Sequence, residues 1–221
     1  MTDSRNGILR IVGGHPALDL VNTVAPRVPG ETGGHDYLSG PAELLAWSGR
    51  IGLLEPAEAE AVDAVWQGSS DLAEKALRAA VEIREATYVA LAPRAAGVGP
   101  MPATFEAELG SALEQLMLRW SAASARSMLA PTTDGPGVAE LRVGTSPALM
   151  IPDRLVAAAV ELLRTVELRQ LRACPVDDGG CGFLFLDRSR NGSRRWCSME
   201  DCGTRAKIRK LSARRRSAST V

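Results

Sequence analysis

The sequence has few aromatic residues and no long apolar run. Phe, Trp and Tyr make up 4% of the 221 residues, whereas alanine is abundant, and this composition favours helices. No apolar run reaches the roughly 18 residues that a membrane-spanning helix needs. The N-terminal stretch MTDSRNGILR also lacks the basic and then apolar pattern of a signal peptide. We therefore expect a cytoplasmic protein.

Motifs that would indicate catalysis are missing too. His15 and His35 are the only histidines in the sequence. It contains no Gly-x-Ser-x-Gly elbow, no phosphate-binding loop and no His-Glu-x-x-His motif. We therefore expect that the protein is not an enzyme.

Cysteine is scarce but concentrated. All four cysteines, Cys174, Cys181, Cys197 and Cys202, lie within 29 residues, with spacers of 6, 15 and 4 residues. Disulfides are rare in the cytoplasm, and four unrelated buried cysteines would seldom cluster so tightly. Two cysteine pairs about fifteen residues apart suit one structural Zn²⁺ ion held by four thiolates. The pattern predicts a zinc site made of these four residues.

The first 168 residues and the remaining segment carry net charges of opposite sign. Residues 1–168 hold 13 Lys and Arg against 21 Asp and Glu, whereas residues 169–221 hold 13 against 5. A basic segment of this density can neutralise several phosphates, although it could also be a solvated face that aids solubility. The candidate nucleic-acid contacts are Arg188, Arg190, Asn191, Arg194, Arg195, Arg205, Lys207, Arg209 and Lys210.

Local patterns within this segment predict a small zinc module. FLFLD (183–187) is typical of a strand, and the Asn-Gly of RSRNGSR indicates a tight turn from which RWC returns toward the metal. Ser198 with Asp201 three residues later predicts a helix start, and Ile208 and Leu211 are candidates for the packed face of that helix. A strand, a hairpin turn and a helix around four cysteines form a treble-clef-like module. Metal binding would supply the folding energy that so short a segment lacks.

The remainder is predicted to be mainly α, with a few short strands. Proline, glycine and apolar spacing predict helices over residues 16–24, 40–54, 55–68, 70–92, 103–125 and 152–174. A strand is expected over residues 8–12, and VAELRV and ALMI predict a hairpin within residues 138–151.

A group of polar residues marks the first predicted helix. Asp19, Asn22 and Thr23 fall on one helical face, and His15 lies one turn earlier. This face is either solvated or engaged in capping a neighbouring element, or it lines a pocket for a small ligand. Arg84, within the strongest predicted helix, would supply a positive charge to such a pocket, so we expect Asp19 and Arg84 to face one cavity.

Two stretches resemble known families. CGFLFLDRSRNGSRRWCSMEDCGTRAK resembles the CGNR zinc finger, which is named after four residues that begin at its last cysteine. Thr204 replaces the family's asparagine, and six residues separate the first two cysteines where members usually have fewer. GGHPALDLVNTV, ELLAWSGRIGLL and ALRAAVEIREA resemble the ABATE domain that usually precedes this finger.

The resemblance implies two domains with different tasks. Residues 1–168 would form a stress-responsive, ligand-sensing domain, and residues 169–221 a zinc-binding and DNA-binding module of a bacterial regulator. We therefore expect a transcription regulator whose partners are DNA and an unknown small effector, and which forms a homodimer by analogy with two-fold operators. Two alternatives stay open: an RNA-binding accessory protein, and a zinc–thiolate redox switch that loses its metal on oxidation.

Overall fold

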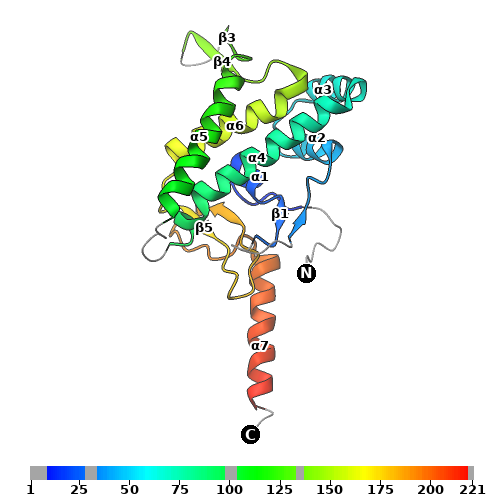
Figure 1. The fold of residues 1–221 in the computed structure, drawn as a ribbon. Coiled ribbons are helices and arrows are strands. Elements are labelled where there is room, and N and C mark those ends of the chain that lie inside the picture. The colour runs from blue at the N-terminus through cyan, green and yellow to red at the C-terminus, as the bar shows by residue number, and fades with distance from the viewer. Residues whose placement is uncertain (1–8, 28–33, 98–103, 133–136, 219–221) are drawn as a thin grey trace. The chain divides into compact units, whose positions relative to one another are not determined.

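The protein is described here by a computed structural model that covers residues 9–27, 34–97, 104–132 and 137–218 (Figure 1). Its helices are α1 (Pro16–Val21), α2 (Pro41–Arg50), α3 (Pro56–Gly68), α4 (Ser70–Ala95), α5 (Phe105–Ser124), α6 (Met150–Thr165) and α7 (Thr204–Ala218). One 3₁₀ turn, η1 (Pro147–Leu149), precedes α6, and one π-helical turn, η2 (Met199–Gly203), precedes α7. The mainly α fold is therefore confirmed. Among the described residues, no helix combines the length and apolarity that crossing a membrane requires.

The strands are short and pair only locally. β1 (Val24–Ala25) pairs with β2 (His35–Asp36), β3 (Met128–Pro131) with β4 (Ala139–Arg142), and β5 (Leu171–Ala173) with β6 (Leu184–Leu186). All three pairs are antiparallel, and each forms a two-stranded sheet.

The described residues belong to two compact units. Unit 1 contains the described parts of residues 1–37, 92–99 and 166–221, and unit 2 those of residues 38–91 and 100–165. The cysteine segment therefore shares a unit with the N-terminal segment that holds α1. This grouping differs from the sequence-based division at residue 168, because it joins the two ends of the chain.

Unit 2 is built on helices whose starts are clear in the sequence. Pro41 and Pro56 occupy the first turns of α2 and α3, where a missing N–H costs nothing. At the start of α3, Glu55 and Glu58 form a capping box, in which the Glu58 carboxylate accepts from the Glu55 N–H. The core side chains of this unit include Leu44, Trp47, Val62, Ile83, Leu116, Leu155 and Leu162.

Unit 1 has a smaller core between α1 and the β5–β6 hairpin. Leu18 and Leu20 of α1 are fully buried, as are Leu171 of β5 and Leu184 and Phe185 of β6. α1 is only six residues long, so tertiary packing, rather than helix propensity, holds it in place.

Several sequence-based expectations about strands are wrong. Residues 139–142 do form a strand, but their partner is the preceding segment 128–131, and ALMI (148–151) runs from η1 into α6 instead. Residues 9–12 form no strand.

Several helix ends also differ from expectation. The helix predicted over residues 16–24 ends at Val21, and Val24 belongs to β1. The helix predicted over residues 40–54 ends at Arg50. The helix predicted over residues 152–174 ends at Thr165, and residues 171–173 become β5, because pairing with β6 satisfies their backbone in the core. α4 continues through Pro93 to Ala95 instead of ending at residue 92.

Candidate metal centre and basic surface

The four cysteine sulfurs converge as a metal site requires. The Sγ atoms of Cys174, Cys181, Cys197 and Cys202 all lie within 4.8 Å of one another. Cys181 Sγ is 3.4 Å from Cys197 Sγ, and Cys197 Sγ is 3.6 Å from Cys202 Sγ. Four thiolates around one Zn²⁺, at Zn–S distances of about 2.3 Å, lie about 3.8 Å apart. The donor set therefore fits one tetrahedral zinc ion.

The thiols strongly affect one another's acidity. Hydrogen bonding to Cys181 lowers the pKa of Cys174 to about 7, and hydrogen bonding to Cys174 lowers the pKa of Cys202. The same contacts within the cluster raise the pKa values of Cys181 and Cys197. The guanidinium of Arg205 places a positive charge next to the cluster, and its Nη2 donates to Cys202 Sγ at 3.0 Å. An arginine beside a zinc thiolate offsets part of the negative charge that four thiolates bring to one divalent ion.

The first cysteine pair is connected by a knuckle that needs glycine. A Cβ on Gly180 would lie 2.7 Å from Cys174 Sγ and 2.6 Å from the Pro175 carbonyl oxygen. Gly182 has φ 76°, and a Cβ there would overlap the Arg27 carbonyl. The longer spacer between Cys174 and Cys181 is thus accommodated without moving either sulfur out of the cluster.

Asp187 organises the turn that follows β6. Its carboxylate accepts from the N–H and the hydroxyl of Ser189 and from the N–H of Arg194, at 2.9, 2.6 and 2.8 Å. The hydrogen bond from the Ser189 hydroxyl is the main cause that lowers the pKa of Asp187. The predicted turn exists, with Gly192 at φ 58°, but β6 pairs with β5 and not with the returning RWC segment.

The N-terminal segment completes the zinc module. The side-chain amide of Asn22 donates to the Leu184 carbonyl at 2.8 Å and accepts from the Leu184 N–H at 2.9 Å. Further along β6, the Leu186 N–H donates to the Gly13 carbonyl at 2.9 Å. Next to the cluster itself, the Arg27 N–H donates to the Cys181 carbonyl at 2.7 Å.

Ion pairs join the same two segments at the start of the C-terminal helix. Arg10 forms ion pairs with Glu200 at 2.9 Å and with Asp201 at 3.0 Å. Ser198 caps this helical stretch, as predicted, because its hydroxyl accepts from the Asp201 N–H at 3.3 Å. Thr204, at the position of the CGNR asparagine, donates to the Met199 carbonyl at 3.1 Å.

The polar residues predicted to line a ligand pocket are engaged with backbone groups. Asp19 is buried and accepts from the Val12 and Gly13 N–H groups at 3.0 and 2.8 Å; burial raises its pKa, against those two bonds. His15 Nδ1 accepts from the Ala17 N–H, and Thr23 donates to the Leu20 carbonyl. These residues, like Asn22, stabilise unit 1 through backbone contacts. Helical spacing in the sequence did not reveal this role.

Arg84 lies in unit 2 and is buried. Its Nε donates to Glu85 Oε1 at 2.8 Å. That Asp19 and Arg84 line one cavity stays a prediction, as does ligand binding by any of the five candidate residues.

The candidate nucleic-acid contacts divide into two groups. Arg194 and Arg205 support the module, and Arg195 pairs with Asp178 while its guanidinium lies 5.3 Å from the Trp196 ring. Arg194 donates to the Val12, Trp196 and Cys197 carbonyls, and its guanidinium lies 4.4 Å from the Phe185 ring centre.

The other candidates are available at the surface. Asn191 is exposed in the turn. The exposed Arg209 lies next to the knuckle, where a Cβ on Gly179 would be 2.8 Å from its guanidinium. Four further exposed cations make no ion pair with any described residue: Arg188, Arg190, Lys207 and Lys210.

Comparison with protein families agrees with both parts of the chain. The model described as "CGNR zinc finger" matches residues 170–215, which include all four cysteines. The ABATE model, described as "Putative stress-induced transcription regulator", matches residues 14–166 and so covers more than half of the chain. The chain belongs to the ABATE family. A comparison with curated proteins finds no match.

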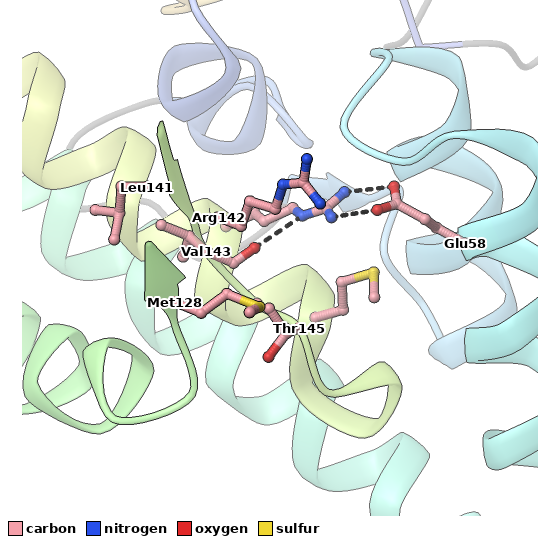
Figure 2. A pocket seen from close by; sticks show the side chains of 9 residues that line it. Glu58, Met128, Leu141, Arg142, Val143 and Thr145 are labelled. Atoms are coloured by element: carbon pink, nitrogen blue, oxygen red, sulfur yellow. Dashed lines mark hydrogen bonds and ion pairs between the residues drawn. The ribbon is translucent and has the colours of Figure 1, made fainter. Parts of the chain in front are cut away.

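The ABATE region also contains a pocket within unit 2. It has a volume of about 580 Å³ and lies between β3, β4 and the N-terminal ends of α3 and α6. Arg154 lines the pocket and donates to both carboxylate oxygens of Glu58, at 2.7 and 2.5 Å, and to the Val143 carbonyl at 3.2 Å (Figure 2). It also donates to the Leu53 carbonyl. The other lining residues are Met128, Leu141, Arg142, Gly144, Thr145 and Met150.

Proposed function

We propose that this ABATE-family regulator acts by binding DNA through its zinc module and not by catalysis. The observation that carries the proposal is a set of four exposed cations on the module that the four cysteines organise, none of which forms an ion pair with a described residue: Arg188, Arg190, Lys207 and Lys210. Cations that already pair with a carboxylate would have to give up that pair before contacting a phosphate. Unpaired ones can neutralise phosphates at once and release the condensed counterions.

α7 supports this proposal by its charge and its exposure. The helix contains seven Lys and Arg residues and no acidic residue. Lys207 to Leu211 are all exposed, and Figure 1 shows α7 running away from the β5–β6 hairpin. Ile208 and Leu211, which were predicted to pack, are 57% and 55% exposed. At about 1.5 Å per residue, fifteen residues make a helix of about 22 Å, and the major groove of DNA is wide enough for a helix.

Effector sensing is the second part of the proposal, and the pocket of unit 2 supports it. Its volume of about 580 Å³ lies within the range of small-molecule sites, which is about 300–1,000 Å³. Met128, Leu141 and Val143 offer an apolar wall. Arg142 adds a guanidinium that pairs with Glu140, and its side chain is 60% exposed. An effector there would fit a bacterial, cytoplasmic stress regulator.

The decisive experiment is selection of bound fragments from genomic DNA and total RNA, run side by side on the zinc-loaded full chain. Enrichment of a shared DNA sequence, lost in excess DNA competitor, supports the proposal. Binding that survives DNA competitor but is lost to structured RNA would instead favour an RNA-binding accessory protein. Release of zinc by low doses of peroxide, without nucleic-acid binding, would favour a redox switch.

A further inference from the structure

We propose that the outer edge of β4 is an interface between two copies of this chain. In this arrangement, β4 pairs antiparallel with β4 of the partner copy about a two-fold axis at Leu141. The inference goes beyond DNA binding and effector sensing and does not depend on either of them.

The backbone pattern of the β3–β4 sheet leaves β4 with a free edge. The register pairs Leu129 with Leu141 and Ala130 with Glu140, and the Thr132 N–H donates to the Val138 carbonyl at 3.3 Å. Hydrogen-bonded and non-hydrogen-bonded pairs alternate along an antiparallel ladder. Because Thr132 and Val138 are hydrogen-bonded, the pair of Leu129 and Leu141, three positions along, is a non-hydrogen-bonded pair. The N–H and C=O of Leu141 therefore point outward, and no described residue bonds to them.

The apolar face of this sheet lacks a covering layer among the described residues. Leu129 is 70% exposed and Leu141 is 54% exposed, and the register places them directly opposite each other. Isolated two-stranded hairpins are marginal in water, and an open edge next to exposed leucines favours pairing with another chain. In the proposed dimer, two strands become four, and Leu141 pairs with Leu141 of the partner copy.

The charges of β4 select a second copy as the occupant. Glu140 and Arg142 flank Leu141 on the opposite face and already pair within one chain, with Arg142 Nε 2.7 Å from Glu140 Oε1. A two-fold axis at Leu141 places Glu140 opposite Arg142 of the partner copy, and Arg142 opposite the partner's Glu140. Each carboxylate then lies between two guanidinium groups, as a self-complementary interface requires.

The same charges exclude neighbouring registers. An axis at residue 140 would place two glutamates opposite each other, and an axis at residue 142 would place two arginines opposite each other, both of which are unfavourable. Hydrogen bonding alone does not fix the register, because all three placements of the axis pair outward-facing residues with each other. The charges therefore select the register centred on Leu141. The Val143 carbonyl already accepts from Arg154 at 3.2 Å, so the ladder is short and the dimer is expected to be weak.

Charge reversal on the zinc-loaded full chain tests the interface by sedimentation velocity over a concentration series. The wild type should dimerise reversibly. Glu140→Arg and Arg142→Glu should each raise the dimer dissociation constant by about tenfold or more, since two opposite-charge pairs become like-charge pairs. Glu74→Arg and Arg78→Glu, which reverse exposed charges on α4, should leave the dimer dissociation constant unchanged.

Mixing the two variants makes the test specific. Each variant alone carries charges of one sign at positions 140 and 142, whereas in a mixed pair the two arginines of one copy lie opposite the two glutamates of the other. The 1:1 mixture and the double reversal of Glu140 and Arg142 in one chain should both restore dimerisation to near the wild-type level. A monomeric wild type, variants that dimerise like it, or a mixture that stays monomeric would each overturn the proposal.

Discussion

Asn22 makes two hydrogen bonds to the backbone of Leu184, although 162 residues separate them in the chain. Both residues are buried, so each partner would be left unsatisfied without the other. The bridge joins the helix that begins the ABATE match to the strand that leads into the CGNR turn. The zinc module therefore has two parts: residues 9–27 and the cysteine segment.

The first prediction concerns this bridge. Asn22→Ala should reduce the free energy of unfolding of unit 1 by about 2–4 kcal/mol, because it leaves the Leu184 N–H and C=O without partners in the core. Zinc should also transfer faster to a competing chelator, because β6 closely follows Cys181 in the chain and holds that ligand in place. Chemical denaturation and chelator kinetics measure the two effects. Asn191→Ala, at an exposed turn position, is the matched control, and equal behaviour of the two variants would contradict the bridge.

The second prediction concerns the metal. Purified protein should hold about one zinc per chain, and Cys197→Ser should lose it. Hydrogen exchange should then lose protection over residues 166–218 and also over residues 9–27, because the Arg27 and Asn22 contacts depend on the folded knuckle and β6. α2, α3, α5 and α6 lie in unit 2 and should keep their protection. Retained protection in residues 9–27 would mean that the cysteine segment folds separately.

Sequence patterns predicted the zinc centre well because its ligands lie close in the chain and their chemistry is restrictive. The starts of α2 and α3 were equally accessible, since Pro41 and Pro56 mark them locally. β5 was missed because Leu171–Ala173 contains no residue that signals the end of a helix. These residues form a strand because they pair with β6, which lies further along the chain. Asn22 was missed as a bridge for a similar reason. Helical spacing shows which residues share a face, but not which distant backbone groups that face will meet.

The third prediction concerns pH and the pocket of unit 2. Hydrogen bonding to Arg154 lowers the pKa of Glu58 to about 2 from an ordinary value of 4.5. Because the folded-state value is the lower one, the pair contributes stability above about pH 4.5 and loses it as the pH falls toward 2. Glu58→Gln keeps a capping side chain but removes the charge.

Unfolding measured from pH 7 to pH 2 checks this. The Glu58→Gln variant should be less stable than the wild type by about 1–2 kcal/mol near neutral pH, a value reduced by solvent screening because the Glu58 side chain is 32% exposed. The difference should shrink as the pH falls through the range in which Glu58 takes up a proton. Glu74→Gln, on the exposed face of α4, should follow the wild type throughout. A difference that does not vary with pH would mean that packing, and not charge, explains the contribution of Glu58.

The last prediction separates nucleic-acid contacts from structural arginines. Replacing both Arg188 and Arg190 with alanine, or both Lys207 and Lys210, should weaken DNA binding and lower the salt slope by about 0.9 log units per lost phosphate contact. Zinc content and stability should not change, because these four side chains make no ion pair with any described residue. Arg194→Ala should instead reduce stability first, since its guanidinium donates to the Val12 and Trp196 carbonyls and lies over the Phe185 ring. Binding isotherms at several salt concentrations, with zinc analysis of each variant, distinguish the two classes. If both double variants keep the wild-type affinity and salt slope, this basic surface does not bind DNA, whatever the zinc content.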